Sequence, residues 1–469
     1  MQFDSALFGL FVLAVLALDA ALRRPGARKA LLLLASYLFY ANWDWRYLGL
    51  LLLSTAVDFR AGAAMHRSDD PRTRRAWLLV SLVTNLGLLA TFKYGNLVLA
   101  SLEPLFAAGG VALPRLPTEI PVGISFYTFQ TLSYTIDIYR RNSEPTERLL
   151  DFAVFVAFFP QLVAGPIVRS REFLPQLRRL PSPSLERAAD GAQRFLLGLF
   201  KKVVIADNVG VFVDGVFAAP GDHGAAVLWC GAWGFALQIY CDFSAYTDMA
   251  IGTARAFGFR LPENFDLPYL SRSMTEFWRR WHLSLSTWLR DYLYIPLGGS
   301  RRGPGRTYVN LAVTMLLGGL WHGASWTFLV WGGLHGLFLA LERLRGVQAE
   351  PDPCARWTPA AVLRGFLTFQ LVTLTWVVFR AADFPSMGLY LERMLTAWGG
   401  PDDGLRAGLG WAGVLALLTM GQFLSRASRW REELWERLPP AVQGLALALL
   451  LLTVSAFQTE GATFLYFQF

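Results

Sequence analysis

Long apolar stretches alternate with short polar connections along almost the whole of this 469-residue chain. Many stretches approach the roughly 20 residues that an α-helix needs to cross a bilayer. The apolar runs cover residues 6–22, 30–41, 47–58, 77–99, 121–138, 151–168, 192–216, 225–253, 308–320, 325–342, 362–380, 408–424 and 440–457. This pattern predicts an all-α polytopic membrane protein with about 10–13 embedded helices, and one transmembrane domain over residues 1–469.

The charges in the connections predict an orientation for these helices. Lys and Arg gather in 23–29, 67–75 and 139–148, whereas 42–46 and 103–118 carry little charge. Cytoplasmic loops of membrane proteins are enriched in Lys and Arg. The alternation therefore predicts that the basic loops are cytoplasmic and that the N-terminus is extracytoplasmic.

One apolar run departs from this rhythm. Residues 152–168 contain Pro160, Gly165 and Pro166, and basic loops flank both ends of the run. Basic loops at both ends indicate that the two ends of the run lie on the same side of the membrane. This predicts a re-entrant segment, which enters and leaves the membrane without crossing it. Irregular backbone at membrane depth is tolerated only where protein or a water-filled cavity covers it. We therefore expect the chain to enclose an internal cavity.

Composition narrows the class of protein further. Hydrophobic residues make up 54% of the chain and charged residues 17%, with a net charge of +8. These values exclude a disordered chain and argue against a soluble enzyme. Because the basic residues lie between apolar runs, the positive charge indicates cytoplasmic loops beside lipid rather than a nucleic-acid partner. No phosphate-binding G-x-x-x-x-G-K-[ST] loop and no G-x-S-x-G nucleophile motif occurs.

The longest polar stretch covers residues 259–306 and combines eight arginines with many aromatic side chains. One interpretation is an interfacial amphipathic helix with snorkelling arginines and an aromatic belt. The other is a basic, aromatic-lined mouth that receives an anionic cytoplasmic substrate, such as a nucleotide-bearing thioester. Both interpretations remain open at this point.

Three of the five histidines, His282, His322 and His335, lie in or beside apolar sequence. His66 and His223 lie in polar sequence, and we assign them no role. Ionisable side chains within a membrane protein's apolar segments are costly and usually functional. No histidine pair has the spacing of a zinc motif, so we predict no metal site. Neutral imidazole suits proton transfer near pH 7, for example from a hydroxyl that attacks a thioester.

Acidic side chains also interrupt an apolar run. Asp242 and Asp248 lie near Tyr240 and Ser244 within residues 225–253. These two aspartates either belong to a hydrogen-bonded structural network, or they line a cavity or orient a histidine.

Several motifs resemble one known family. The run from Ser273 to Ser286, S-M-T-E-F-W-R-R-W-H-L-S-L-S, resembles the central motif of the membrane-bound O-acyltransferase family, and Trp321-His322-Gly323 resembles that family's near-invariant histidine. Residues 121–130, 159–167, 238–248 and 464–469 are similar to its bacterial branch, which includes the alginate O-acetyltransferase membrane subunit and the D-alanyl transfer protein of teichoic acids.

This resemblance implies a funnel-shaped fold with a central tunnel that contains both main histidines. It makes His322 the expected catalytic residue and His282 its assistant, with His335 as an additional candidate. Arg279 and Arg280 either hold the phosphates of a coenzyme A donor or anchor their helix at the interface. The expected tunnel lining comprises Asp242, Trp278, Trp281 and Trp321.

The resemblance also implies a function. We expect an O-acyltransferase of the bacterial inner membrane that moves acetyl from cytoplasmic acetyl-CoA toward an extracytoplasmic polysaccharide such as alginate. Acetyl-CoA, or an acyl carrier, is then a donor substrate, and no tightly bound cofactor is expected. A separate extracytoplasmic protein would complete the transfer. The alternatives are D-alanyl transfer to teichoic acid-type acceptors and a non-enzymatic transporter of a polysaccharide or lipid intermediate.

Overall fold

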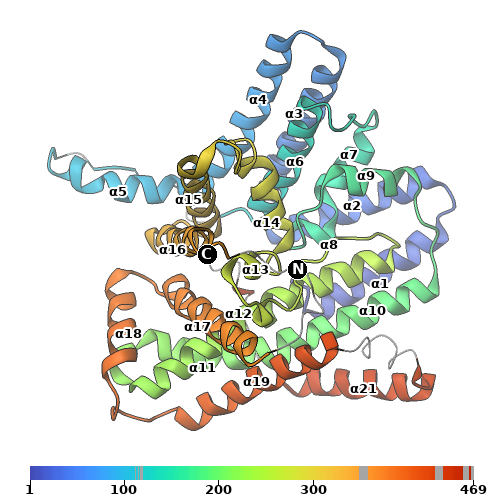
Figure 1. Ribbon diagram of the computed structural model, residues 1–469. Helices are drawn as coiled ribbons and strands as arrows, with labels where there is room; N and C mark the ends of the chain where they lie inside the picture. Colours follow the sequence, from blue (N-terminus) through green and yellow to red (C-terminus); the bar gives the residue numbers. More distant parts are fainter. Residues whose placement is uncertain are drawn as a thin grey trace. The chain divides into compact units, whose positions relative to one another are not determined.

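The computed structural model describes residues 1–110, 112–114, 116, 120–347, 358–427, 437–457 and 464–465. All regular secondary structure in these residues is helical, as the apolar pattern predicts. Figure 1 shows these helices, and the chain forms two compact units. Unit 1 comprises Met1–Phe195 and Tyr246–Pro262, and unit 2 comprises Leu196–Ala245 and Glu263–Phe469. One transmembrane domain over residues 1–469 remains a prediction.

Unit 1 is built from helices that expose large apolar side chains. It contains α1 (Ala6–Ala21), α2 (Pro25–Asp44), α3 (Leu48–Arg67), α4 (Pro71–Leu89), α5 (Gly95–Ala107), α6 (Ile124–Tyr139), α7 (Leu149–Ala157), α8 (Phe159–Leu162) and α9 (Ser170–Arg178), together with most of α10 (Leu185–Phe200) and the end of α12 (Ala225–Ala256). Leu10, Leu13 and Val83 are 64–70% exposed. A surface of such residues is typical of helices that face lipid.

Buried ion pairs connect the first helices of unit 1. Arg28 on α2 donates two hydrogen bonds of 2.7 Å to the carboxylate of Asp19 on α1. Lys29, the next residue, forms a 2.7 Å ion pair with Asp151 on α7. An ion taken out of water must be paired, so these contacts favour one arrangement of α1, α2 and α7 over alternatives.

The predicted re-entrant segment is a broken helix. α7 ends at Ala157, α8 lasts only four residues, and residues 163–169 are non-helical and buried. Gly123 packs against this break with a φ of +76°, and a Cβ there would lie 2.5 Å from the carbonyl oxygen of Leu162. Only glycine accommodates both that conformation and that approach. The break is thus confirmed, and entry and exit on one side of the membrane remain a prediction.

Unit 2 contains most of α12 and the later helices. These are α11 (Asp207–Ala218), α13 (Met274–Trp278), α14 (Leu283–Leu289), α15 (Gly303–His322), α16 (Trp326–Leu344), α17 (Pro359–Arg380), α18 (Phe384–Thr396), α19 (Leu405–Ala427) and α21 (Pro440–Phe457), with π-helical turns at Lys201–Ala206 and Arg290–Tyr294. Its core is aromatic: Tyr269, Trp281, Trp331 and Trp376 are each at most 4% exposed.

α15 and α16 form a hairpin whose helices approach very closely (Figure 1). A Cβ on Gly319 of α15 would lie 2.2 Å from the carbonyl oxygen of Phe328, and one on Gly332 of α16 would lie 2.2 Å from that of Met315. Small residues at a helix crossing allow such backbone contact in membrane proteins. The hairpin fixes His322, the last residue of α15, against α16.

Four helical stretches among the described residues are long and apolar enough to cross a bilayer: Pro25–Arg67, Pro71–Ala107, Pro359–Arg380 and Pro440–Phe457. Other predicted runs form helices that carry polar or small residues, including α12, α15 and α16. Such residues lower the mean hydropathy of a helix that is buried inside the protein. The expected total of embedded helices therefore remains a prediction.

Candidate functional site

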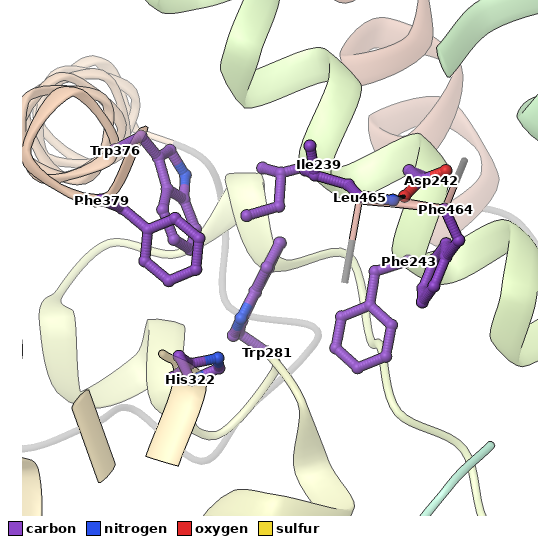
Figure 2. A pocket seen from close by; sticks show the side chains of 9 residues that line it. All are labelled: Ile239, Asp242, Phe243, Trp281, His322, Trp376, Phe379, Phe464 and Leu465. Carbon is purple, nitrogen blue, oxygen red and sulfur yellow. Dashed lines mark hydrogen bonds between the residues drawn. The ribbon is translucent and has the colours of Figure 1, made fainter. Parts of the chain in front are cut away.

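Unit 2 contains a cavity to which residues from five parts of the chain contribute. Its lining comprises Ile239, Asp242 and Phe243 from α12, Trp281 after α13, His322 at the end of α15, Trp376 and Phe379 from α17, and Phe464 and Leu465 near the C-terminus. In Figure 2, His322 and Trp281 approach from below and Ile239 and Asp242 from above. Seven of these nine residues are apolar or aromatic, so the histidine and the aspartate provide the ionisable groups.

His322 lies where α15 ends and an extended residue, Gly323, begins. Its side chain is buried among aromatic rings. The centroid of its imidazole lies 5.1 Å from that of Trp331 and 5.5 Å from that of Phe379. The helix end aims the imidazole at the cavity, and the surrounding rings restrict its rotation.

His282 approaches His322 from a different element. Their ring centroids lie 6.4 Å apart, and the His282 ring also packs on Phe243 at 4.7 Å. His282 is fully buried, and within the described residues neither of its ring nitrogens has a hydrogen-bond partner. An imidazole in this state keeps both nitrogens available for a bound substrate.

The backbone at His282 adopts a left-handed conformation with φ of +46° and ψ of +54°. Non-glycine residues seldom adopt it, so the surroundings must hold it in place. Asn264 is part of that support. Its carbonyl oxygen accepts from the amide of Leu283, and its side-chain oxygen accepts from the amide and the hydroxyl of Ser284. The start of α14, and with it the His282 ring, is thereby fixed.

Asp242 combines the two roles that the sequence left open. It lines the cavity and belongs to a buried network. Lys202 forms ion pairs with Asp242 at 2.9 Å and with Asp207 at 2.5 Å. The amide of Leu465 donates to the Asp242 carboxylate at 2.8 Å. This last contact holds the described part of the C-terminal motif in the cavity wall; residues 466–469 of that motif lie outside the described residues.

Two of the four expected tunnel residues, Asp242 and Trp281, line the cavity, whereas Trp278 and Trp321 are not among its lining residues. Trp321 is buried against both main histidines, with ring centroids 5.8 Å from His282 and 5.1 Å from His322. Trp278 instead contacts His335, donating its indole N–H to Nδ1 at 3.2 Å. The structure therefore places His282, His322 and Trp321 together and His335 one aromatic layer away, behind Trp331.

The arginine pair next to His282 has two different environments. Arg280 is buried and paired with Glu276 at 2.9 Å and with Asp266 at 3.0 Å. The side chain of Arg279 is exposed. Residues 259–306 form the short helices α13 and α14 and a π-helical turn rather than one long amphipathic helix, and several of their aromatic rings are buried.

Sequence reasoning did not find Trp376 and Phe379, which form one side of the cavity. They lie three residues apart on α17, a spacing that places two side chains on one helix face. That spacing is common in any buried helix, so it gave no functional signal. Within the described part of the chain, no three His, Cys, Asp or Glu side chains lie close enough to share a metal ion.

Comparisons with known proteins identify the family of this chain. The model of the membrane-bound O-acyltransferase family matches residues 124–373. The chain is 46% identical to a probable alginate O-acetylase of Azotobacter vinelandii (82% of this chain, 76% of the relative) and 37% identical to a peptidoglycan O-acetyltransferase of Helicobacter pylori (81% and 76%). It is 30% identical to a teichoic acid D-alanyltransferase of Streptococcus thermophilus (55% and 68%). The chain belongs to the membrane-bound O-acyltransferase family.

Proposed function

We propose that this multi-pass membrane enzyme transfers an acetyl group from acetyl-CoA on the cytoplasmic side toward a polysaccharide outside the bacterial inner membrane. One observation carries the proposal: His322 lines a cavity, with a second buried histidine, His282, at a ring distance of 6.4 Å. The proposed orientation has the basic loops in the cytoplasm and the N-terminus outside.

The proposed reaction uses His322 as a general base. Its neutral imidazole takes the proton from the acceptor hydroxyl while that oxygen attacks the thioester carbonyl carbon. The carbon–sulfur bond of the tetrahedral intermediate then breaks, and the coenzyme A thiolate takes the proton from the imidazolium. His282 assists by a hydrogen bond from its ring, because its nitrogens have no partner within the described residues.

The donor's phosphates need a cationic contact on the protein. Arg279 is exposed, whereas Arg280 is already neutralised by Glu276 and Asp266. We therefore assign a donor phosphate to Arg279 and the anchoring of α13 to Arg280. Arginine suits this role because its planar guanidinium binds phosphate oxygens in pairs.

The relatives guide the choice of acceptor. The three named above act, by their names, on alginate, peptidoglycan or teichoic acid. Identity is higher to the two acetylating relatives than to the D-alanylating one, which favours acetyl over D-alanyl as the transferred group. We propose an exopolysaccharide such as alginate as the final acceptor, reached with the help of an extracytoplasmic partner protein.

The test uses the purified chain in nanodiscs, with an alginate oligosaccharide as acceptor and with acetyl-CoA that carries a radiolabel in its acetyl group. Thioester loss and label transfer are followed in the wild type, His322→Ala and His282→Ala. His66→Ala is the matched control, because His66 is exposed in the last turn of α3. Turnover in the wild type and in His66→Ala that is abolished in His322→Ala supports the proposal.

Other outcomes would overturn it. Full turnover in a stably folded His322→Ala protein would exclude His322 as the base. Transfer of D-alanyl from its carrier, without use of acetyl-CoA, would show that the transferred group is D-alanyl rather than acetyl. Absence of saturable acetyl-CoA binding to the wild type, together with flux of a labelled lipid-linked saccharide into sealed proteoliposomes, would favour a transporter.

A further inference from the structure

α16 carries three side chains that reach the elements around the cavity. Trp331, His335 and Glu342 are spaced at i, i+4 and i+11, which places them within about 40° of one another around the helix. Trp331 contacts the His322 ring at 5.1 Å. The other two side chains contact α13, the short helix that precedes Trp281 and His282. One face of α16 therefore contacts His322 directly and also contacts α13, the helix that precedes His282.

His335 binds through both of its ring nitrogens. The hydroxyl of Thr375 donates to the carbonyl oxygen of Val372 at 2.7 Å, so its oxygen accepts from His335 Nε2 at 3.1 Å. His335 Nδ1 accepts from the Trp278 indole at 3.2 Å. These partners select the neutral tautomer with the proton on Nε2. His335 thus connects α17, α16 and α13, and neither nitrogen is left for a substrate.

Glu342 binds the first turn of α13. Its carboxylate accepts from the amide of Met274 at 2.6 Å, the amide of Thr275 at 2.9 Å and the Thr275 hydroxyl at 2.8 Å. The first amides of a helix have no partner within the helix, and a negative charge there is favourable. A five-residue helix has little stability of its own, so this contact from α16 helps to hold α13 in place.

The end of α13 continues directly into the cavity wall. The amide of Trp281 donates to the carbonyl of Phe277, the fourth residue of α13, at 2.8 Å, and the two rings stack at 5.5 Å. His282 follows Trp281 immediately. A shift of α13 would therefore move the tryptophan and the second histidine together, while His322 stayed on α15.

We propose that His335 and Glu342 are positioning residues that hold α13, and through it Trp281 and His282, at the distance from His322 that acyl transfer requires. This inference rests on the proposed function for its kinetic readout. Misplacement of a reacting group by about 1 Å reduces turnover by about 100-fold. Loss of either contact should therefore lower kcat and leave the KM for acetyl-CoA nearly unchanged.

The test at His335 separates positioning from proton transfer. His335→Ala should lower kcat by about 10- to 100-fold. His335→Asn, which keeps an acceptor for the Trp278 indole, should recover much of that loss, with an unchanged pH profile. Thr375→Val should also lower kcat, whereas Thr373→Val on the same helix should not, because Thr373 Oγ1 has no partner within the described residues. A His335→Asn protein no more active than His335→Ala, or one whose residual activity has lost a limb of the pH profile, would overturn the proposal.

The test at Glu342 includes a readout that does not depend on activity. Hydrogen exchange of the amides in 273–282, measured by mass spectrometry in nanodiscs, should accelerate in Glu342→Ala. It should accelerate less in Glu342→Gln, which keeps one acceptor oxygen. Glu392→Gln, an exposed change on α18, is the control and should behave as wild type. Unchanged exchange and unchanged kcat in Glu342→Ala would overturn the proposal. A wild type that neither turns over nor saturably binds acetyl-CoA, together with accelerated exchange in Glu342→Ala, would refute only the proposed function.

Discussion

The imidazole rings of His282 and His322 lie 6.4 Å apart although 40 residues separate them in the chain. His322 is held by a helix end, and His282 by a single left-handed residue. The pair thus depends on one rigid helical hairpin and on one energetically costly backbone conformation.

That conformation leads to a prediction about stability. His282→Gly and His282→Ala both remove the ring, so both should lose transferase activity. Glycine adopts a φ of +46° readily, whereas alanine does not. The glycine variant should therefore be the more stable of the two by about 1 kcal/mol. Thermal unfolding in detergent measures the difference, and an alanine variant as stable as the glycine variant would contradict a strained backbone.

The hairpin leads to a second prediction, based on two adjacent glycines of α16. In Gly332→Ala, the added methyl carbon would lie 2.2 Å from the carbonyl oxygen of Met315, which is a clash. In Gly333→Ala, the atom nearest to the added methyl carbon is a Leu316 methyl carbon at 3.4 Å. Gly332→Ala should push α15 away, reduce stability by about 1–3 kcal/mol and reduce turnover. Gly333→Ala should resemble the wild type. Melting temperatures and acetyl-CoA turnover of the two proteins, compared side by side, provide the check.

The aromatic side of the cavity predicts acyl-group selectivity. Phe379 lines the cavity next to His322, so a smaller side chain there should leave room for a longer acyl chain. Phe379→Leu should raise the turnover of propionyl-CoA relative to acetyl-CoA by about tenfold, since one methylene is worth about 1–3 kcal/mol in a fitted pocket. Phe366→Leu, an exposed change on the same helix, should leave the ratio unchanged. If Phe379→Leu and Phe366→Leu gave the same ratio of propionyl-CoA to acetyl-CoA turnover, the acyl chain would not lie against Phe379.

The buried charges around Asp242 predict that loss of Lys202 destabilises the protein and that a second substitution restores part of the stability. Lys202→Met leaves Asp207 and Asp242 without the cation that both contact. Removal of one member of a buried ion pair costs about 3–5 kcal/mol. A further Asp242→Asn change removes one of the two charges and still offers an oxygen to the Leu465 amide. The double variant should therefore unfold at a higher temperature than Lys202→Met alone. A double variant that is less stable than the single one would show that Lys202 acts through other contacts.

Part of the site could be predicted from the sequence because the signals are local. Apolar runs at 308–320 and 325–342 correspond to α15 and α16. His322 and Asp242 stood out against apolar neighbours, and His282 stood out through the motif that surrounds it. The apolar run at 77–99 predicted the bounds of its helix less well, because α4 continues through a π-helical turn at Ala90–Tyr94 into α5. A single widened turn has no clear signature in a hydrophobic pattern.

The sequence by itself determined that this chain is a helical membrane protein, which segments are apolar, and which family motifs and histidines they carry. Those properties follow from composition and short-range spacing, to which the bilayer's thickness and the cost of burying charge apply directly. The tertiary structure decided which histidines meet and which aromatic rings complete the cavity. It also decided that His335 binds Trp278 and Thr375 while Glu342 holds α13. These contacts join residues 40 to 68 positions apart, and close packing of backbones and side chains selects them rather than local sequence.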